Sequence, residues 1–73
     1  MPGMLGLAVA SLTDREMDVL QLVAKGLSYQ EISGVLSLRY YTVASYLKRI
    51  YRKLAVRSRG EAVFEARQMG LLE

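Results

Sequence analysis

Apolar residues recur with the period of an α-helix in four successive segments of the chain. The clearest stripe is Val43, Leu47, Ile50 and Leu54, whose spacings of four, three and four residues place all of them on one side of a helix. The other stripes are Met17, Leu20, Val23 and Leu27; Ile32, Val35 and Leu36; and Ala62, Ala66 and Met69, with Val63 at the edge. These stripes predict helices over about 14–25, 29–36, 40–54 and 59–69. Because no segment alternates with the two-residue period of a strand, the predicted fold class is all-α.

Capping signals sharpen three of the four helix starts. A Ser or Thr is followed three residues later by a glutamate, the spacing of a capping box, at Thr13–Glu16, Ser28–Glu31 and Ser58–Glu61. Gly26 and Gly70 supply helix stops. The 40–54 helix has Arg39 where a capping side chain is expected, and losing an N-cap costs about 1 kcal/mol unless Ser37 caps an earlier start.

The two middle helices are joined by only residues 37–39, which predicts the sharp crossing of a helix-turn-helix. Such a crossing needs a small side chain at the contact, and Ser33 supplies one. Val43 is expected to plug the crossing from the second helix, and Tyr29 to pack at the start of the first.

The cationic residues are unevenly distributed along the chain. The net charge is only +3, yet residues 39–59 contain no acid and seven cations, namely Arg39, Lys48, Arg49, Arg52, Lys53, Arg57 and Arg59. This is the footprint of a polyanion binder, against which stands the simpler interpretation of a solvated basic surface. Opposite the apolar stripe, the 40–54 helix carries Tyr41, Ala44, Ser45, Lys48 and Arg52, with Arg49 on one flank and Lys53 further round toward the core. Small residues near the start of this helix would permit close approach to base edges, while Lys and Arg reach guanine acceptors or phosphates.

Composition excludes several other functions. The chain has no His and no Cys, and its acids lie where helix capping explains them, so we expect no enzyme, metal or cofactor. No apolar run approaches the roughly 20 residues of a membrane span. With 73 residues the chain is one small domain, expected to be cytoplasmic and to hold no small-molecule ligand. Residues 1–11 are interpreted as a flexible arm or linker remnant, with a packed N-terminal segment as the alternative, and residues 12–73 as the folded domain.

Several motifs together resemble the LuxR/FixJ/GerE-type DNA-binding domain, over residues 12 to 72. They are LTDRE (12–16), LVAKGLSYQEIS (22–33), TV (42–43), IYRKLAVRSRGEAV (50–63) and GLL (70–72). The resemblance implies a bacterial transcription-factor domain that binds double-stranded DNA as a homodimer, with the 40–54 helix in the major groove. It implies base contacts from Ala44, Ser45 and Lys48, to which exposure adds Tyr41. It implies phosphate contacts from Thr42, Arg52 and Lys53, to which Arg39 and Arg49 are added. It also implies a dimer contact through Phe64 near Gln68, with small alanines permitting close helix approach; the alternative is that Phe64 is only a lone exposed aromatic residue.

Two positions depart from the family pattern: Arg39 replaces a serine at the helix cap, and Tyr46 replaces a histidine. Tyr46 and Tyr51 border the core side of the helix and are expected to be mainly structural.

The nearest alternative function is a promoter-contacting helix-turn-helix of a larger machine, sigma-factor-like or transposase-like, acting as a monomer. A protein-only interaction module is a further alternative, and RNA polymerase is a candidate partner. Either a stand-alone regulator or the output domain of a longer protein fits the sequence.

Overall fold

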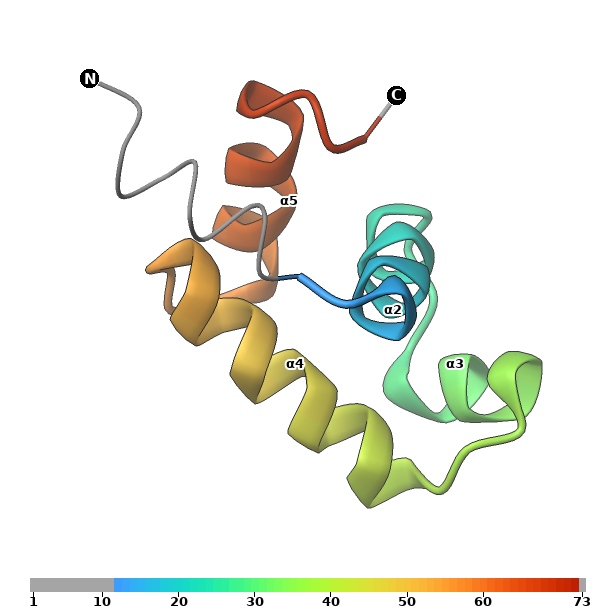
Figure 1. The fold of residues 1–73 in the computed structure, drawn as a ribbon. Helices are drawn as coiled ribbons and strands as arrows, with labels where there is room; N and C mark the ends of the chain where they lie inside the picture. Colours follow the sequence, from blue (N-terminus) through green and yellow to red (C-terminus); the bar gives the residue numbers. More distant parts are fainter. Residues whose placement is uncertain (1–11, 73) are drawn as a thin grey trace.

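The computed structural model describes residues 12–72, which form four helices and contain no strand (Figure 1). The helices are α2 (Asp14–Ala24), α3 (Tyr29–Leu36), α4 (Tyr40–Leu54) and α5 (Arg59–Gln68). The all-α prediction is confirmed: α3 and α4 have the predicted bounds, and α2 and α5 each end one residue earlier. The interpretation of residues 1–11 as an arm lies outside the described residues.

The long helix α4 organises the others. It contacts all three of the others, α2, α3 and α5 (Figure 1). Its predicted stripe is fully buried, with Val43, Leu47, Ile50 and Leu54 each at most 2% exposed. Ala62 and Ala66 are also buried, so these two alanines bring α5 close to the core and do not lie on an open face.

The burial of some apolar side chains on α2 and α3 differs from the prediction. On α2, Leu20 and Val23 are buried as predicted, but Val19 is buried too, while Met17 is only partly buried. This helix contacts α3, α4 and α5, so its buried surface is wider than one stripe. On α3, the prediction for Val35 was wrong, because its side chain is 60% exposed and Ile32 alone in that helix is fully buried.

Two of the three expected capping boxes are complete, at Thr13–Glu16 and Ser28–Glu31. At the third, Ser58 Oγ accepts the Glu61 N–H at 3.2 Å, but the Glu61 carboxylate accepts the N–H of Arg57 at 2.8 Å and not that of Ser58. The capping signals therefore located the starts of α2, α3 and α5 correctly, although the Glu61 carboxylate accepts a different N–H from the one expected.

The turn of the helix-turn-helix is made by Ser37, which adopts the left-handed conformation with φ 55°. Ser33 O accepts the Leu38 N–H at 3.0 Å and closes the turn. Since Ser37 ends α3, it does not cap α4, and Arg39 occupies the N-cap position with no side-chain hydrogen bond to the helix. The start of α4 is consequently held by packing, with Val43 fully buried one turn later.

A buried ion pair joins the start of α2 to the end of α4. Glu16 is 1% exposed, and Lys53 Nζ donates to its Oε1 at 2.7 Å. Burial by itself raises the pKa of the Glu16 carboxyl, but the hydrogen bonds from Lys53 and from the Thr13 N–H outweigh burial and hold that pKa below its ordinary value. This pair fixes the C-terminal half of α4 against α2.

Candidate nucleic-acid interface

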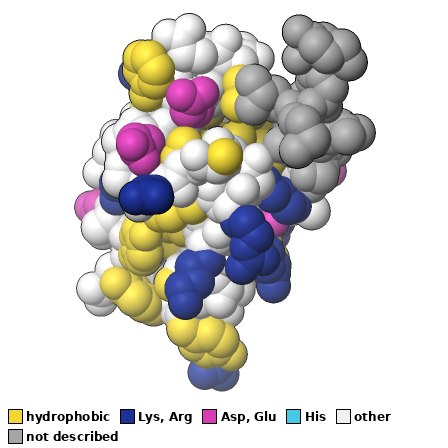
Figure 2. Space-filling model, turned by 90° about the vertical axis from the view of Figure 1, so that its left-hand side faces the viewer, with side chains coloured by type: hydrophobic (Ala, Val, Ile, Leu, Met, Phe, Trp, Pro, Cys, Tyr) yellow, Lys and Arg dark blue, Asp and Glu magenta, His cyan; other side chains and the backbone are white. Residues whose placement is uncertain are grey.

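The outward face of α4 is polar and cationic. Tyr41 is 67% exposed, and Ser45, Lys48 and Arg52 are also exposed. These four residues repeat at helical spacing and lie opposite the buried stripe, so the packing of the core directs them outward. Figure 2 shows the side of the molecule on which α4 lies, with Lys and Arg side chains gathered over the lower half of that face.

Two of the predicted contact residues lie at the edges of this face. Ala44 and Thr42 are half-buried, on opposite flanks of the exposed row. Thr42 belongs to the first turn of α4, where its N–H donates to Arg39 O at 3.0 Å. The exposed centre of the predicted reading face is therefore Tyr41, Ser45 and Lys48.

The cations predicted to contact phosphates fall into two groups. Arg39, Arg49 and Arg52 are exposed, at the start, flank and outer face of α4. Lys53 differs, because its ammonium is bound to the buried carboxylate of Glu16 and its side chain is only 26% exposed. The structure thus gives Lys53 a packing role, and the open cationic surface consists of the other residues.

Tyr46 supports one of these cations. The Arg49 guanidinium lies over the Tyr46 ring, 5.5 Å from the ring centroid, and Tyr46 itself is half-buried against the core. A guanidinium stacked on an aromatic face is held in one orientation by the charge distribution of the ring. The sequence placed both residues on α4 at i and i+3, a spacing that allows this contact, but the contact was not anticipated.

A second aromatic group ties α3 to α4. The rings of Tyr29 and Tyr40 lie 5.8 Å apart at 46°, and the hydroxyls of Tyr29 and Tyr51 lie 3.5 Å apart. Burial, followed by this hydrogen bond, raises the pKa of Tyr51 to about 12. The expected structural roles of Tyr29 and Tyr51 agree with these contacts, which join the start of α3 to the first and last turns of α4.

Arg59 has a role that sequence reasoning missed. It stood in the cationic run, yet its Nη2 donates to the carbonyl oxygens of Val23, at 3.2 Å, and of Leu27. These carbonyls lie at and just after the end of α2, where helix carbonyls lack partners within the helix. Only its place beside the Ser58 cap, at the first position of α5, could have suggested that Arg59 is turned toward a neighbouring helix.

The outer side of α5 presents a lone aromatic residue. Phe64 is 58% exposed, and Gln68 is exposed one turn later. Beside Phe64 lies a hollow of about 440 Å³, lined by Ala55, Val56, Gly60, Glu61, Phe64 and Glu65. An exposed aromatic side chain next to a hollow is one form of the self-complementary surface that two-fold dimers use.

Metal and membrane features are not seen in residues 12–72. No group of three or more His, Cys, Asp or Glu side chains there could hold a metal ion. None of the four helices is long and apolar enough to cross a bilayer.

Comparison with known proteins agrees with this arrangement. The sequence model described as "Bacterial regulatory proteins, luxR family" matches residues 10–66. The chain is 44% identical over 59 residues to the transcriptional regulatory protein DesR of Bacillus subtilis, covering 81% of this chain and 30% of DesR. It is 42% identical over 62 residues to the response regulator protein VraR of Staphylococcus aureus, covering 85% of this chain and 30% of VraR. The chain therefore spans about 30% of the length of these curated relatives.

Proposed function

The chain belongs to the luxR family of bacterial regulatory proteins, and we propose that its helix-turn-helix binds specific double-stranded DNA sequences as a homodimer and so regulates transcription. In this proposal α4 lies in the major groove. DNA binding and transcription regulation follow from the family, whereas the groove, the dimer and the residues are argued from the face of α4 and the side of α5. The cytoplasm, where bacterial DNA lies, is the expected place of action.

The outward face of α4 is the observation that carries the proposal. A helix with its side chains is about 10–12 Å across, which fits the roughly 12 Å width of the major groove. With 15 residues α4 is about 22 Å long, so its exposed row can follow the groove. Tyr41 and Ser45 offer hydroxyls to base edges, and Lys48 reaches purine acceptors. Half-buried Ala44 leaves room for the groove wall on one flank.

Phosphate contacts would surround this row. Arg39 at the N-cap position and Arg49 and Arg52 along the helix are exposed and extend toward either side of a groove, and Thr42 adds a hydroxyl. If each chain neutralises about three phosphates, through Arg39, Arg49 and Arg52, the logarithm of a dimer's affinity falls with the logarithm of salt concentration at a slope of about −5. Arg49 enters this set already oriented by Tyr46.

The dimer contact would use the exposed side of α5. Phe64 from each protomer would enter the hollow beside Gly60 of its partner, with Gln68 at the edge. Two copies of α4 would then lie about one DNA turn apart and read an inverted repeat. RNA polymerase is a further candidate partner, since regulators of transcription act on its use of promoters.

The test is selection of bound sequences from a random duplex library at near-physiological salt. We expect enrichment of an inverted repeat with half-sites about 10 base pairs apart. The Phe64→Glu variant should enrich only the single half-site, because its α4 is intact. A single half-site from the unmodified chain would favour the monomeric machine component, and no enrichment would contradict sequence-specific binding.

A further inference from the structure

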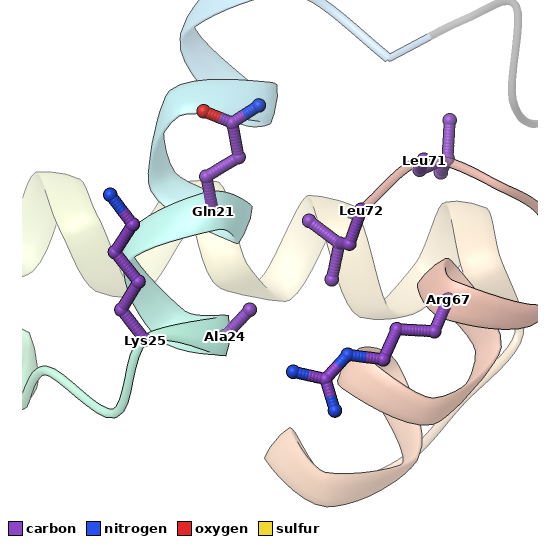
Figure 3. Close-up of a pocket in the computed structure, with 6 residues that line it drawn as sticks. All are labelled: Gln21, Ala24, Lys25, Arg67, Leu71 and Leu72. Carbon is purple, nitrogen blue, oxygen red and sulfur yellow. The ribbon is translucent and has the colours of Figure 1, made fainter.

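A pocket lies on the part of the surface where α2, α5 and the C-terminal tail meet. Its volume is about 370 Å³, within the roughly 300–1,000 Å³ range of binding pockets, and Figure 3 shows the residues that line it, Gln21, Ala24, Lys25, Arg67, Leu71 and Leu72. The tail wall is fixed in place: Gly70 turns the chain with φ +77°, and the Leu71 N–H then donates to Ala66 O at 2.9 Å.

The pocket combines cations with an apolar lining. Lys25 and Arg67 are exposed and have no carboxylate partner among residues 12–72. Ala24, Leu71 and Leu72 are half-buried and supply apolar surface between them. A hollow with unpaired cations beside apolar side chains is complementary to a ligand that has a carboxylate next to a bulky apolar group.

The carbonyls at the end of α2 do not account for Lys25. A lysine at the end of a helix can satisfy the last carbonyls, which carry partial negative charge. At the end of α2, however, Arg59 already donates to Val23 O and Leu27 O, and the backbone N–H of Gly26 also donates to Val23 O. The Lys25 ammonium is left available to an outside anion.

DNA held by α4 is not that anion. The buried stripe of α4 faces α2 and α5, and the exposed row around Lys48 points away from them. In Figure 3 the ribbon of α4 passes behind the pocket. A duplex on the outer face of α4 therefore leaves the pocket open to a second partner, a step that rests on the proposed function.

We infer that this pocket docks a short acidic peptide segment of another protein. A carboxylate of the segment pairs with Lys25 and Arg67, Gln21 hydrogen-bonds its backbone, and a neighbouring apolar side chain packs on Leu71 and Leu72. A domain that binds DNA on one side would thereby hold a protein on the other.

The test is a phage-displayed library of random 12-residue peptides selected on the 73-residue chain without DNA, followed by titration of the enriched peptides in solution. The reporting variant is Lys25→Gln/Arg67→Gln. The matched control, Lys48→Gln/Arg52→Gln, removes the same charge from the exposed face of α4. All four side chains are exposed, so thermal unfolding should be unchanged in both variants.

We expect enrichment of peptides with Asp or Glu next to a bulky apolar residue. Their affinity should fall at least about tenfold in the Lys25→Gln/Arg67→Gln variant and stay within about twofold in the control, and a bound duplex should not displace them. Equal losses of peptide affinity in both variants would show that only the net charge of the domain matters, and would overturn the proposal. Enrichment of peptides without acids, or of none, would also overturn it. Because the peptides are selected without DNA, the two proposals can fail independently. If the DNA proposal is wrong, the chain will bind the peptides but will not bind duplex DNA.

Discussion

The ion pair between Glu16 and Lys53 offers a prediction that can be worked from the structure. Glu16→Gln keeps the size of the side chain and leaves an oxygen that can accept the Thr13 N–H, now 2.9 Å from Oε1. The change removes the charge that faces Lys53 Nζ at 2.7 Å and replaces the second carboxylate oxygen by an amide NH2 group.

The expected cost at neutral pH is about 2 kcal/mol. A hydrogen bond to a charged group contributes about 1.5–3 kcal/mol, and removing one partner of a fully buried ion pair costs about 3–5 kcal/mol. The lower range applies because Lys53 is 26% exposed and water can solvate its ammonium in the variant. For a domain of this size the loss corresponds to a fall of roughly 8–16 °C in melting temperature.

The cost should depend on pH with a defined sign. The folded-state pKa of Glu16 lies below its ordinary value of 4.5, so the unfolded chain takes up a proton first as pH falls. The stabilisation is complete above that ordinary value and is lost as pH falls through the lowered folded pKa. The unfolding free energies of the parent chain and of Glu16→Gln should accordingly converge in acid, measured by urea unfolding with circular dichroism from about pH 7 to about pH 2.5.

Glu61→Gln is the matched control. Glu61 also accepts a backbone N–H, that of Arg57 at 2.8 Å, but it is exposed and has no ion pair among the described residues. Its replacement should cost less than about 1 kcal/mol. If Glu16→Gln cost no more than this control, or if its cost persisted unchanged in acid, the ion pair with Lys53 would not be a source of stability.

Three further predictions concern the proposed complex with DNA. Lys48→Ala should cost about 1–3 kcal/mol in binding to the selected operator and relax preference at one base position; an equal loss on all sequences in a mobility-shift series would make it a phosphate contact. A Cβ added at Gly60 or at Gly34 meets nothing within 4 Å, so both Gly→Ala changes should stabilise folding by up to about 1 kcal/mol. Only Gly60→Ala should weaken dimerisation, measured by sedimentation; equal dimerisation of the two variants would place the dimer contact elsewhere. Tyr46→Leu should weaken binding to every duplex by about 0.5–1 kcal/mol because Arg49 loses its cation–π contact with the ring, whereas Tyr46→Phe keeps the ring and should bind as the parent chain does. Equal losses of affinity for the two variants in a titration would assign the effect to the Tyr46 hydroxyl.

Local signals in the sequence predicted most of the fold. The stripe of α4 and the Ser or Thr caps are properties of neighbouring residues, so α3 and α4 have the predicted bounds and the other helices differ by one residue. Val35 shows the limit of such signals, because a helix of eight residues can bury one apolar side chain and expose another at similar spacing.

Contacts between distant residues were not predictable in the same way. Glu16 carries the signature of a capping box, which explains its position fully at the level of sequence, yet it also lies under Lys53, which is 37 residues away. Arg59 likewise reads as one more cation of a basic run until packing places the start of α5 against the end of α2. The cations Lys53 and Arg59 are both bound to groups within the fold. The open cationic surface is therefore smaller than the charge pattern suggested.

The most direct test of α4 in the major groove uses modified purines. In the selected operator, 7-deazaguanine and 7-deazaadenine would replace single purines, removing the N7 acceptor from the major groove while base pairing is kept. At the position read by Lys48, we predict a loss of about 1–3 kcal/mol for the parent chain and none for Lys48→Ala, which already lacks that contact. Unchanged affinity at every substituted purine would contradict the placement of α4 in the major groove.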